Sequence, residues 1–269
     1  MTTPAPLPKE AEIYNRVVHL LSEGGENEFE LHKLRVELQR LRNGNSGDMA
    51  LVYASLGFLN HLAGDVPGMR ECFQNSVRLN PGIVHVRTNM CFSYGNVGDF
   101  ETAAREADIL CRMAPDTIAA LEAAIMAYET NFQFDKAFDA IEMLERVSVN
   151  NPSRRNSFVS PVLVRRTVEL LGKHGYTEQD LRDRVGLAVD TLRDLDGVGP
   201  VRTGCRFQED GSLRVQLSIK GTMAECAEVD FVIAERLAER FERMAAEVLS
   251  IEAMPLSVYY EREAAEASV

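Results

Sequence analysis

Tryptophan is absent from this chain of 269 residues, and aromatic residues make up only 7% of it. Surfaces that stack sugars or bases need aromatic rings, so carbohydrate binding and base stacking are disfavoured. No apolar run reaches the roughly 18 residues of a membrane-spanning helix, and the first ten residues lack the apolar core of a signal peptide. The sequence therefore predicts no membrane partner.

Positive charge is also scarce, because 29 Lys and Arg residues face 41 Asp and Glu residues and give a formal net charge of −12. Nucleic-acid-binding proteins usually carry a basic face, so a nucleic-acid partner is disfavoured. The five cysteines are odd in number and form no Cys-x-x-Cys pair. This usage is typical of a reducing compartment and predicts a cytoplasmic protein.

The motifs of common enzymes are missing as well. The five histidines form no His-Glu-x-x-His pair, and neither a phosphate-cradling Gly-x-x-x-x-Gly-Lys-Ser/Thr loop nor a Gly-x-Gly-x-x-Gly loop is present. We therefore expect no metal, no cofactor and no catalytic activity. Hydrophobic residues make up 45% of the chain and charged residues 26%, which is typical of a folded globular protein.

The chain opens with a proline-rich lead-in over residues 1–8, followed by a predicted helical hairpin. Apolar residues recur at helical spacing from Lys9 to about Ser22 and again from Leu31 to Leu41, with Gly24-Gly25 between the two helices. An Asn/Gly/Ser cluster at residues 43–47 ends the hairpin.

The next hundred residues repeat. Pro81 and Pro115 stand 34 residues apart, as do Gly64-Asp65 and Gly98-Asp99, and Pro152 closes a third unit. Each unit has the pattern of a helix, a turn, a second helix and a proline stop. The third unit departs from the pattern, because Phe132-Gln133 stands where Gly-Asp is expected.

This period resembles the tetratricopeptide repeat (TPR) family over residues 49–152. The resemblance implies hairpins stacked as an α-solenoid with a concave groove that binds a protein or peptide partner. Helix positions that line the groove in the family correspond here to residues that include Phe58, His61, Leu62, His85, Asn89, Phe92, Asn96, Glu122, Met126 and Glu129.

Phe58, Phe92 and Met126 fall at one equivalent position of successive repeats, and we expect an apolar ladder of anchors there. The alternative is that this ladder packs against the chain's own N-terminal hairpin or C-terminal helix. The carboxylate clamp of some TPR proteins is matched only by Asn89, so clamp-type binding of acidic C-termini is disfavoured.

After the repeats, a polar stretch at residues 153–157 predicts a domain boundary between residues 9–152 and a module at 158–262, with a tail at 263–269. Helices are predicted from Pro161 to Lys173 and from Thr177, with a capping box at Thr177–Asp180, to Leu195. A hairpin is predicted at residues 201–219, a helix at 224–248 and a strand at 255–260. The predicted fold class is mainly α, a TPR-like α-solenoid followed by a small α+β module in the order α-α-β-β-α-β.

The function of the module has several possible interpretations. It can provide a second contact or a homodimer interface, which makes the whole chain an interaction scaffold. A second reading is an enzyme whose site includes Cys205 or Cys226, and a third is a regulator with a degenerate helix-turn-helix at residues 177–193. Basic residues that could contact an acidic partner cluster at Arg154, Arg155, Arg165 and Arg166. Acids and arginines of the last helix are predicted to form i,i+4 ion pairs, such as Glu239 with Arg243.

Overall fold

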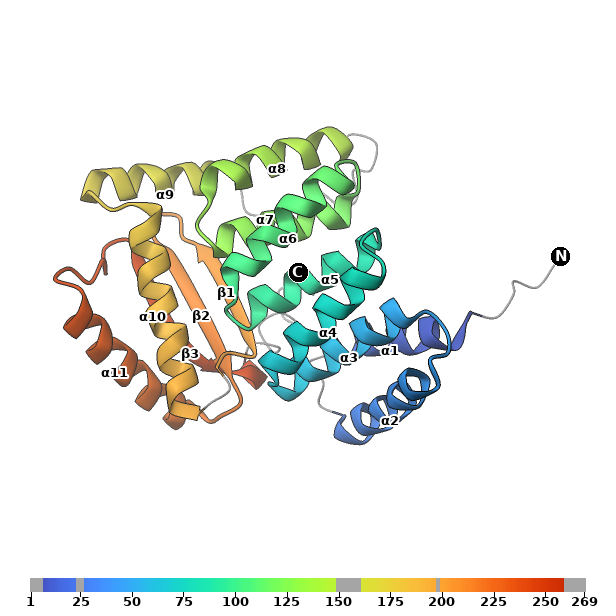
Figure 1. Ribbon diagram of the computed structural model, residues 1–269. Coiled ribbons are helices and arrows are strands. Elements are labelled where there is room, and N and C mark those ends of the chain that lie inside the picture. The colour runs from blue at the N-terminus through green and yellow to red at the C-terminus, as the bar shows by residue number, and fades with distance from the viewer. Residues whose placement is uncertain (1–6, 23–26, 149–160, 197–198, 259–269) are drawn as a thin grey trace. The chain divides into compact units, whose positions relative to one another are not determined.

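The computed structural model describes residues 7–22, 27–148, 161–196 and 199–258 (Figure 1). The chain is mainly helical and its C-terminal part is an α+β module, as predicted. It divides into two compact units, Met1–Met90 and Cys91–Val269. The predicted boundary at residues 153–157 lies outside the described residues.

The first unit begins with the predicted helical hairpin, which packs on the helix that follows it. Both α1 and α2 contact α3, and Val17, Leu34 and Leu38 are fully buried. Arg35 of α2 donates to Asn60 Oδ1 at 2.7 Å and to the Leu59 carbonyl oxygen at 3.1 Å. The helices of this unit are α1 (Lys9–Ser22), α2 (Glu28–Gly44), α3 (Met49–Ala63), α4 (Val66–Leu79) and the beginning of α5 (Val84–Asn96).

The pairing of α3 with α4 depends on a glycine where the two helices approach each other. A Cβ atom at Gly57 would lie 2.4 Å from Phe73 Cε1, so a larger residue would force the helices apart. Gly64 ends α3 in the left-handed conformation, and the Asp65 carboxylate accepts a hydrogen bond from the Gly68 amide and caps α4.

The turns between paired helices keep a strict period. Gly64, Gly98 and Phe132 follow one another at intervals of 34 residues, and all three have positive φ, at 77°, 74° and 50°. The third turn therefore keeps the left-handed geometry of the repeat without its glycine. Phenylalanine is disfavoured in this conformation, because its Cβ crowds the backbone.

The second unit opens with the rest of α5 and the next helices of the repeat and continues with two further helices. Thr177 and Asp180 form the predicted reciprocal cap at the beginning of α10: Asp180 N donates to Thr177 Oγ1 at 3.2 Å, and Thr177 N donates to Asp180 Oδ2 at 2.7 Å. These helices are α6 (Phe100–Met113), α7 (Ile118–Thr130), α8 (Phe134–Ser148), α9 (Pro161–His174) and α10 (Glu178–Asp196).

The predicted α-α-β-β-α-β order is confirmed. Strands β1 (Arg202–Phe207) and β2 (Leu213–Ile219) pair antiparallel, and β3 (Leu249–Pro255) pairs parallel to β2 after the helix α11 (Met223–Arg240). The sheet order is β1-β2-β3, with Thr203 opposite Leu217 and Leu217 opposite Ala253. α11 begins with a capping box of Thr222 and Glu225.

Two predicted boundaries in the module are wrong. The last strand was expected at residues 255–260, but it spans Leu249–Pro255 and residues 256–258 are helical. The preceding helix was expected to reach Val248, but α11 ends at Arg240, and Phe241 is extended. Val248 is nevertheless buried, because the chain turns through Ala245 at φ 59° and brings Val248 into the core at the beginning of β3.

One hydrophobic core joins the last repeat helices to the module. It includes Phe132 and Phe134 beside the turn before α8, residues of α10, and side chains of all three strands. The Phe134 and Phe207 rings meet edge to face at 6.0 Å. Within the second unit, the hairpin of α7 and α8 and the α+β module therefore fold around the same apolar interior.

Candidate interaction surfaces

The predicted anchor Phe58 is not exposed. Its ring is fully buried, with Tyr14 of α1 at 6.0 Å and Phe73 of α4 at 5.0 Å, both edge to face. His61 and Leu62 are buried as well. The N-terminal hairpin thus covers Phe58, the first of the three predicted anchors. This agrees with the alternative that the anchor packs against the chain itself.

Tyr14 also contacts two polar residues of the predicted groove in the first unit, His85 and Asn89. Asn89 Nδ2 donates to the Tyr14 hydroxyl at 2.8 Å, and that hydroxyl donates to the His85 carbonyl oxygen at 3.3 Å. Burial raises the pKa of Tyr14 to about 12, with Asn89 opposing the shift. The imidazole of His85 stands edge to face with the Tyr14 ring at 5.3 Å, and His85 is exposed.

In the second unit, the equivalent side chains Phe92 and Met126 are both half-buried. Met126 lies over α5 at Gly95, where a Cβ atom would be 3.3 Å from Met126 Cε. Glu122, one helical turn before Met126, is half-buried too. These three side chains keep part of their surface accessible.

The C-terminal ends of the same helices are covered by the module. Thr203 Oγ1 of β1 donates to the Asn96 carbonyl oxygen at 3.1 Å. Glu129, in the last turn of α7, is buried, and its Oε1 has no hydrogen-bond partner among the described residues. Burial raises the pKa of Glu129 to about 8, and burial followed by the nearby Glu129 carboxylate raises that of the Cys205 thiol.

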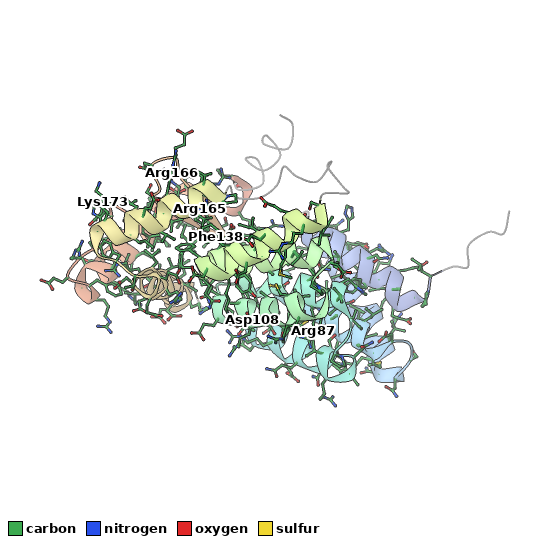
Figure 2. All side chains as sticks on the ribbon, turned by 90° about the horizontal axis from the view of Figure 1, so that it is seen from above. Arg87, Asp108, Phe138, Arg165, Arg166 and Lys173 are labelled. Atoms are coloured by element: carbon green, nitrogen blue, oxygen red, sulfur yellow. The ribbon has the colours of Figure 1, made fainter. Side chains whose placement is uncertain are left out.

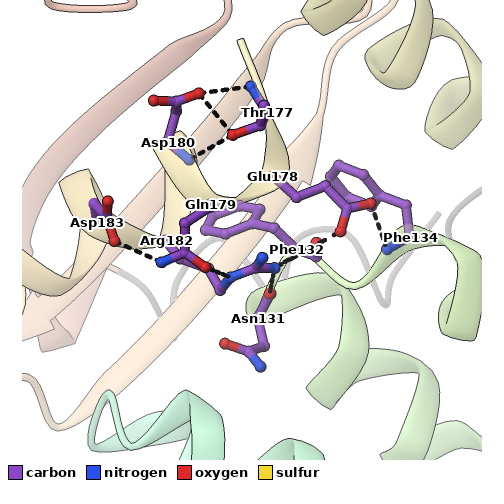
Figure 3. Close-up of polar contacts among 9 residues, drawn as sticks. All are labelled: Asn131, Phe132, Phe134, Thr177, Glu178, Gln179, Asp180, Arg182 and Asp183. Carbon is purple, nitrogen blue, oxygen red and sulfur yellow. Dashed lines mark hydrogen bonds and ion pairs between the residues drawn. The ribbon is translucent and has the colours of Figure 1, made fainter.

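Two arginines of α10 bind the turns at the ends of α5 and α7. Arg182 donates to the carbonyl oxygens of Asn131 and Phe132 at 3.2 and 3.1 Å (Figure 3). Arg193, three helical turns further on, donates to the Val97 carbonyl oxygen at 2.8 Å. Carbonyl groups at a helix C-terminus have no partner within the helix and carry partial negative charge, so cationic donors suit them.

Close packing accompanies these bonds. A Cβ atom at Gly98 would lie 2.6 Å from Val189 Cγ1 of α10, so only glycine permits this approach. At the other turn, Glu178 of α10 accepts a hydrogen bond from the Phe134 amide at 3.3 Å (Figure 3). α10 is thus fixed to two successive turns of the helical hairpins.

The basic cluster contacts the chain itself where it is described. Arg165 lies over the Phe138 ring at 5.7 Å, and Figure 2 shows both side chains on neighbouring helices. Arg166 Nη1 donates to the Glu209 carbonyl oxygen at 2.8 Å and so fixes the turn between β1 and β2. Arg154 and Arg155 lie outside the described residues.

The helix-turn-helix interpretation of residues 177–193 is wrong. α10 spans Glu178–Asp196 as one continuous helix, so residues 177–193 contain no turn between two helices. Leu181, Val185 and Leu192 of this helix are buried in the core. The capping box at Thr177 starts the helix, and Gly186 alone does not interrupt it.

The two thiols of the module, Cys205 and Cys226, have pKa values above the ordinary value of a thiol. Burial raises the pKa of the Cys226 thiol, followed by the nearby Asp230 and Glu225 carboxylates, whereas a cysteine nucleophile needs a lowered pKa. All five cysteines are free. Among the described residues, no three His, Cys, Asp or Glu side chains converge as metal ligands would.

The predicted ion pairs along the last helix are wrong. Arg236 pairs with Asp194 of α10 at 2.6 Å, and Arg243 pairs with Glu247 at 3.4 Å beyond the helix. Glu228, Glu235 and Glu239 of α11 are exposed and have no ion pair with the described residues.

A cavity that the sequence did not reveal lies between α11 and β3. Its volume is about 140 Å³, and its wall includes Arg184, Asp230, Leu237, Met244 and Ile251. The Asp230 carboxylate accepts a hydrogen bond from the Ala253 amide at 2.6 Å. The sequence does contain a pattern that indicates this region: alanines and one phenylalanine recur at spacings of three and four on the outward side of α11.

Comparisons with family models, with curated proteins and with solved structures find no match to this chain. Across the described residues, the helices are too short or too polar to cross a lipid bilayer.

Proposed function

We propose that this chain is a non-catalytic interaction scaffold whose helical hairpins, similar to tetratricopeptide repeats, bind a protein segment. The observation that supports this best is the pair Phe92 and Met126. They occupy one repeat position on α5 and α7, and both keep accessible apolar surface in the second unit. Apolar anchors of this kind, placed beside polar side chains such as Glu122, suit a helix or an extended peptide.

The α+β module supports this role by fixing the helices that present the surface. Arg182 and Arg193 bind the turns after α7 and α5, and the shared core joins α7 and α8 to the sheet. A fixed surface loses less conformational entropy on binding than a mobile one. We propose a cytoplasmic location as well, which the five free thiols support.

The test is affinity capture from the native cell with the full chain as bait, followed by quantitative mass spectrometry. We expect the double variant Phe92→Ala/Met126→Ala to lose the proteins that the unchanged chain captures. Met113→Ala is the matched control, because Met113 is an exposed methionine at the end of α6. Thermal unfolding of each bait verifies that the fold persists. Capture of the same proteins by the double variant contradicts the proposal.

A further inference from the structure

An exposed apolar stripe runs along α11. Ala224, Ala227, Phe231, Ala234 and Ala238 follow one another at spacings of three and four residues, which places them on one side of the helix. All five are exposed, and the Phe231 side chain keeps 67% of its surface accessible. Figure 1 shows α11 at the outer edge of the second unit, with α10 on one side of it.

The α11 stripe continues into the cavity beside it. Ala234 belongs to both, and the cavity extends to Leu237, Met244 and Ile251. Its volume of about 140 Å³ is comparable to cavities that hold one benzene-sized group. Such a hollow beside an exposed phenylalanine is typical of a site that receives an anchoring side chain.

Arg184 of α10 forms part of the cavity wall. Arg184 is 4% exposed, and its Nε has no hydrogen-bond partner among the described residues. Its two terminal nitrogens donate to the carbonyl oxygens of Asp180 and Arg243, at 2.7 and 2.6 Å. The Arg184 guanidinium also lies over the Phe241 ring at 4.3 Å, so these contacts fix it within the wall.

Uncompensated acidic side chains border the stripe. Glu228 and Glu235 follow Ala227 and Ala234 directly and lie on one border, and Asp230 lies on the other. Glu239 and Glu242 add negative charge toward the end of the helix, and none of these glutamates has an ion pair with the described residues. A partner that buries the stripe must meet this charge.

We propose that the α11 stripe and its cavity bind an amphipathic helix whose apolar side is bordered by lysines and arginines. An apolar side chain of that helix fills the cavity next to Ala234, and its cations face Glu228 and Glu235. The proposal gives a site and a partner chemistry to the second contact that the sequence left open for the module. It does not depend on the surface at Phe92 and Met126.

Charge argues against two other occupants. A second copy of the chain would bring Glu228 and Glu235 against acidic side chains whether the two α11 helices run parallel or antiparallel. Residues 259–269 of the chain itself contain three glutamates and one arginine, and so lack the required positive charge.

The test begins with a display library of helical peptides of about 20 residues, in which leucines are fixed at spacings of three and four and the flanking positions are randomised. Selection against the full chain is expected to enrich Lys and Arg at the flanks. The selected peptide is then labelled, and its dissociation constant is measured by fluorescence anisotropy at low and at physiological salt. We expect weaker binding at the higher salt, because exposed charges are screened.

Three variants locate the binding. Phe231→Ala is expected to weaken it by about tenfold or more, whereas Phe29→Ala, at a phenylalanine that is 80% exposed on α2, is expected to leave it unchanged. Glu228→Lys/Glu235→Lys should shift selection to peptides with acidic flanks. Phe231 and both glutamates are exposed, so the fold tolerates these changes.

Selection of neutral or acidic flanks by the unchanged chain would overturn the proposal, as would equal binding by the Phe231→Ala variant. A chain that is dimeric in sedimentation and becomes monomeric on Phe231→Ala would also overturn it, in favour of a second copy. Peptide binding that survives Phe92→Ala/Met126→Ala supports the proposal even where the hairpin surface captures nothing, so the two claims fail separately.

Discussion

At the scale of single residues, the buried carboxyl group of Glu129 contributes to how stability depends on pH. Its pKa is raised by burial from the ordinary 4.5 to about 8. Between these values the folded chain keeps a proton that the unfolded chain releases, so the free energy of unfolding falls as the pH rises through this window.

Glu129→Gln is therefore expected to remove the contribution of Glu129 to this slope. The variant should resemble the unchanged chain near pH 5 and exceed its stability near pH 8 by about 1.4 kcal/mol or more, the equivalent of one pKa unit. Urea unfolding at several pH values measures this difference. Glu145→Gln, on the exposed side of α8, is the control and should leave the slope unchanged. Parallel profiles for Glu129→Gln and the unchanged chain would exclude a neutral carboxyl group at this position.

Phe132 combines an unfavourable backbone conformation with a fully buried ring. Replacing Phe132 with Ala should cost about 3–5 kcal/mol, because a large side chain leaves the core. Phe132→Gly should cost about 1 kcal/mol less than Phe132→Ala, because glycine adopts the positive φ without strain. Chemical denaturation of both variants measures this order. A less stable glycine variant would show that the left-handed turn is not retained in solution.

At the scale of elements, the two arginines of α10 are expected to act as unequal anchors. Arg182 binds two carbonyl oxygens and Arg193 one, so we expect Arg182→Ala to destabilise the chain more, by about 1–3 kcal/mol. Arg182→Lys should restore only part of the stability, because an ammonium group cannot bind the carbonyl oxygens and also supply the Nε donor that binds Gln179 Oε1 at 3.0 Å. Thermal and urea unfolding measure these effects. Full rescue by lysine would indicate that charge alone matters at this turn.

The bounds of the helices, strands and turns could be predicted from the sequence only in part. Glycine, proline and capping residues act locally, so the turns at Gly64 and Gly98, the cap at Thr177 and the order of elements in the module were predictable. Phe241 and Val248 continued the helical spacing of the last helix, yet α11 ends at Arg240. The left-handed turn is at Ala245, so no glycine in the sequence indicates it. The burial of Val248 beside β3 decides where the chain turns.

Long-range contacts limit how well the sequence predicts which residues of the candidate surfaces are exposed. The repeat pattern placed Phe58, Phe92 and Met126 at equivalent positions, but it could not indicate that Tyr14, 44 residues earlier in the chain, covers Phe58. Glu129 was expected to be accessible and is buried, because the module covers the end of α7. The position of a residue within a repeat predicts its side of the helix, whereas its exposure depends on what packs there.

At the scale of the whole molecule, the two units differ in what they leave accessible. In the first unit, the N-terminal hairpin buries the predicted anchor Phe58. The second unit leaves Phe92 and Met126 half-buried and carries the exposed stripe of α11. We therefore expect most of the partner-binding surface to belong to the second unit, on helices that the shared core and the arginines of α10 hold in place.

Site-specific photo-crosslinking in the native cell tests this account most directly. A photoreactive phenylalanine analogue is placed at Met126, and at Met113 as the matched control, and adducts are identified by mass spectrometry. The account predicts an adduct with another protein from position 126 that position 113 does not give. Adducts that are absent from position 126, or equal at both positions, would contradict the claim that this chain binds a protein through its helical hairpins.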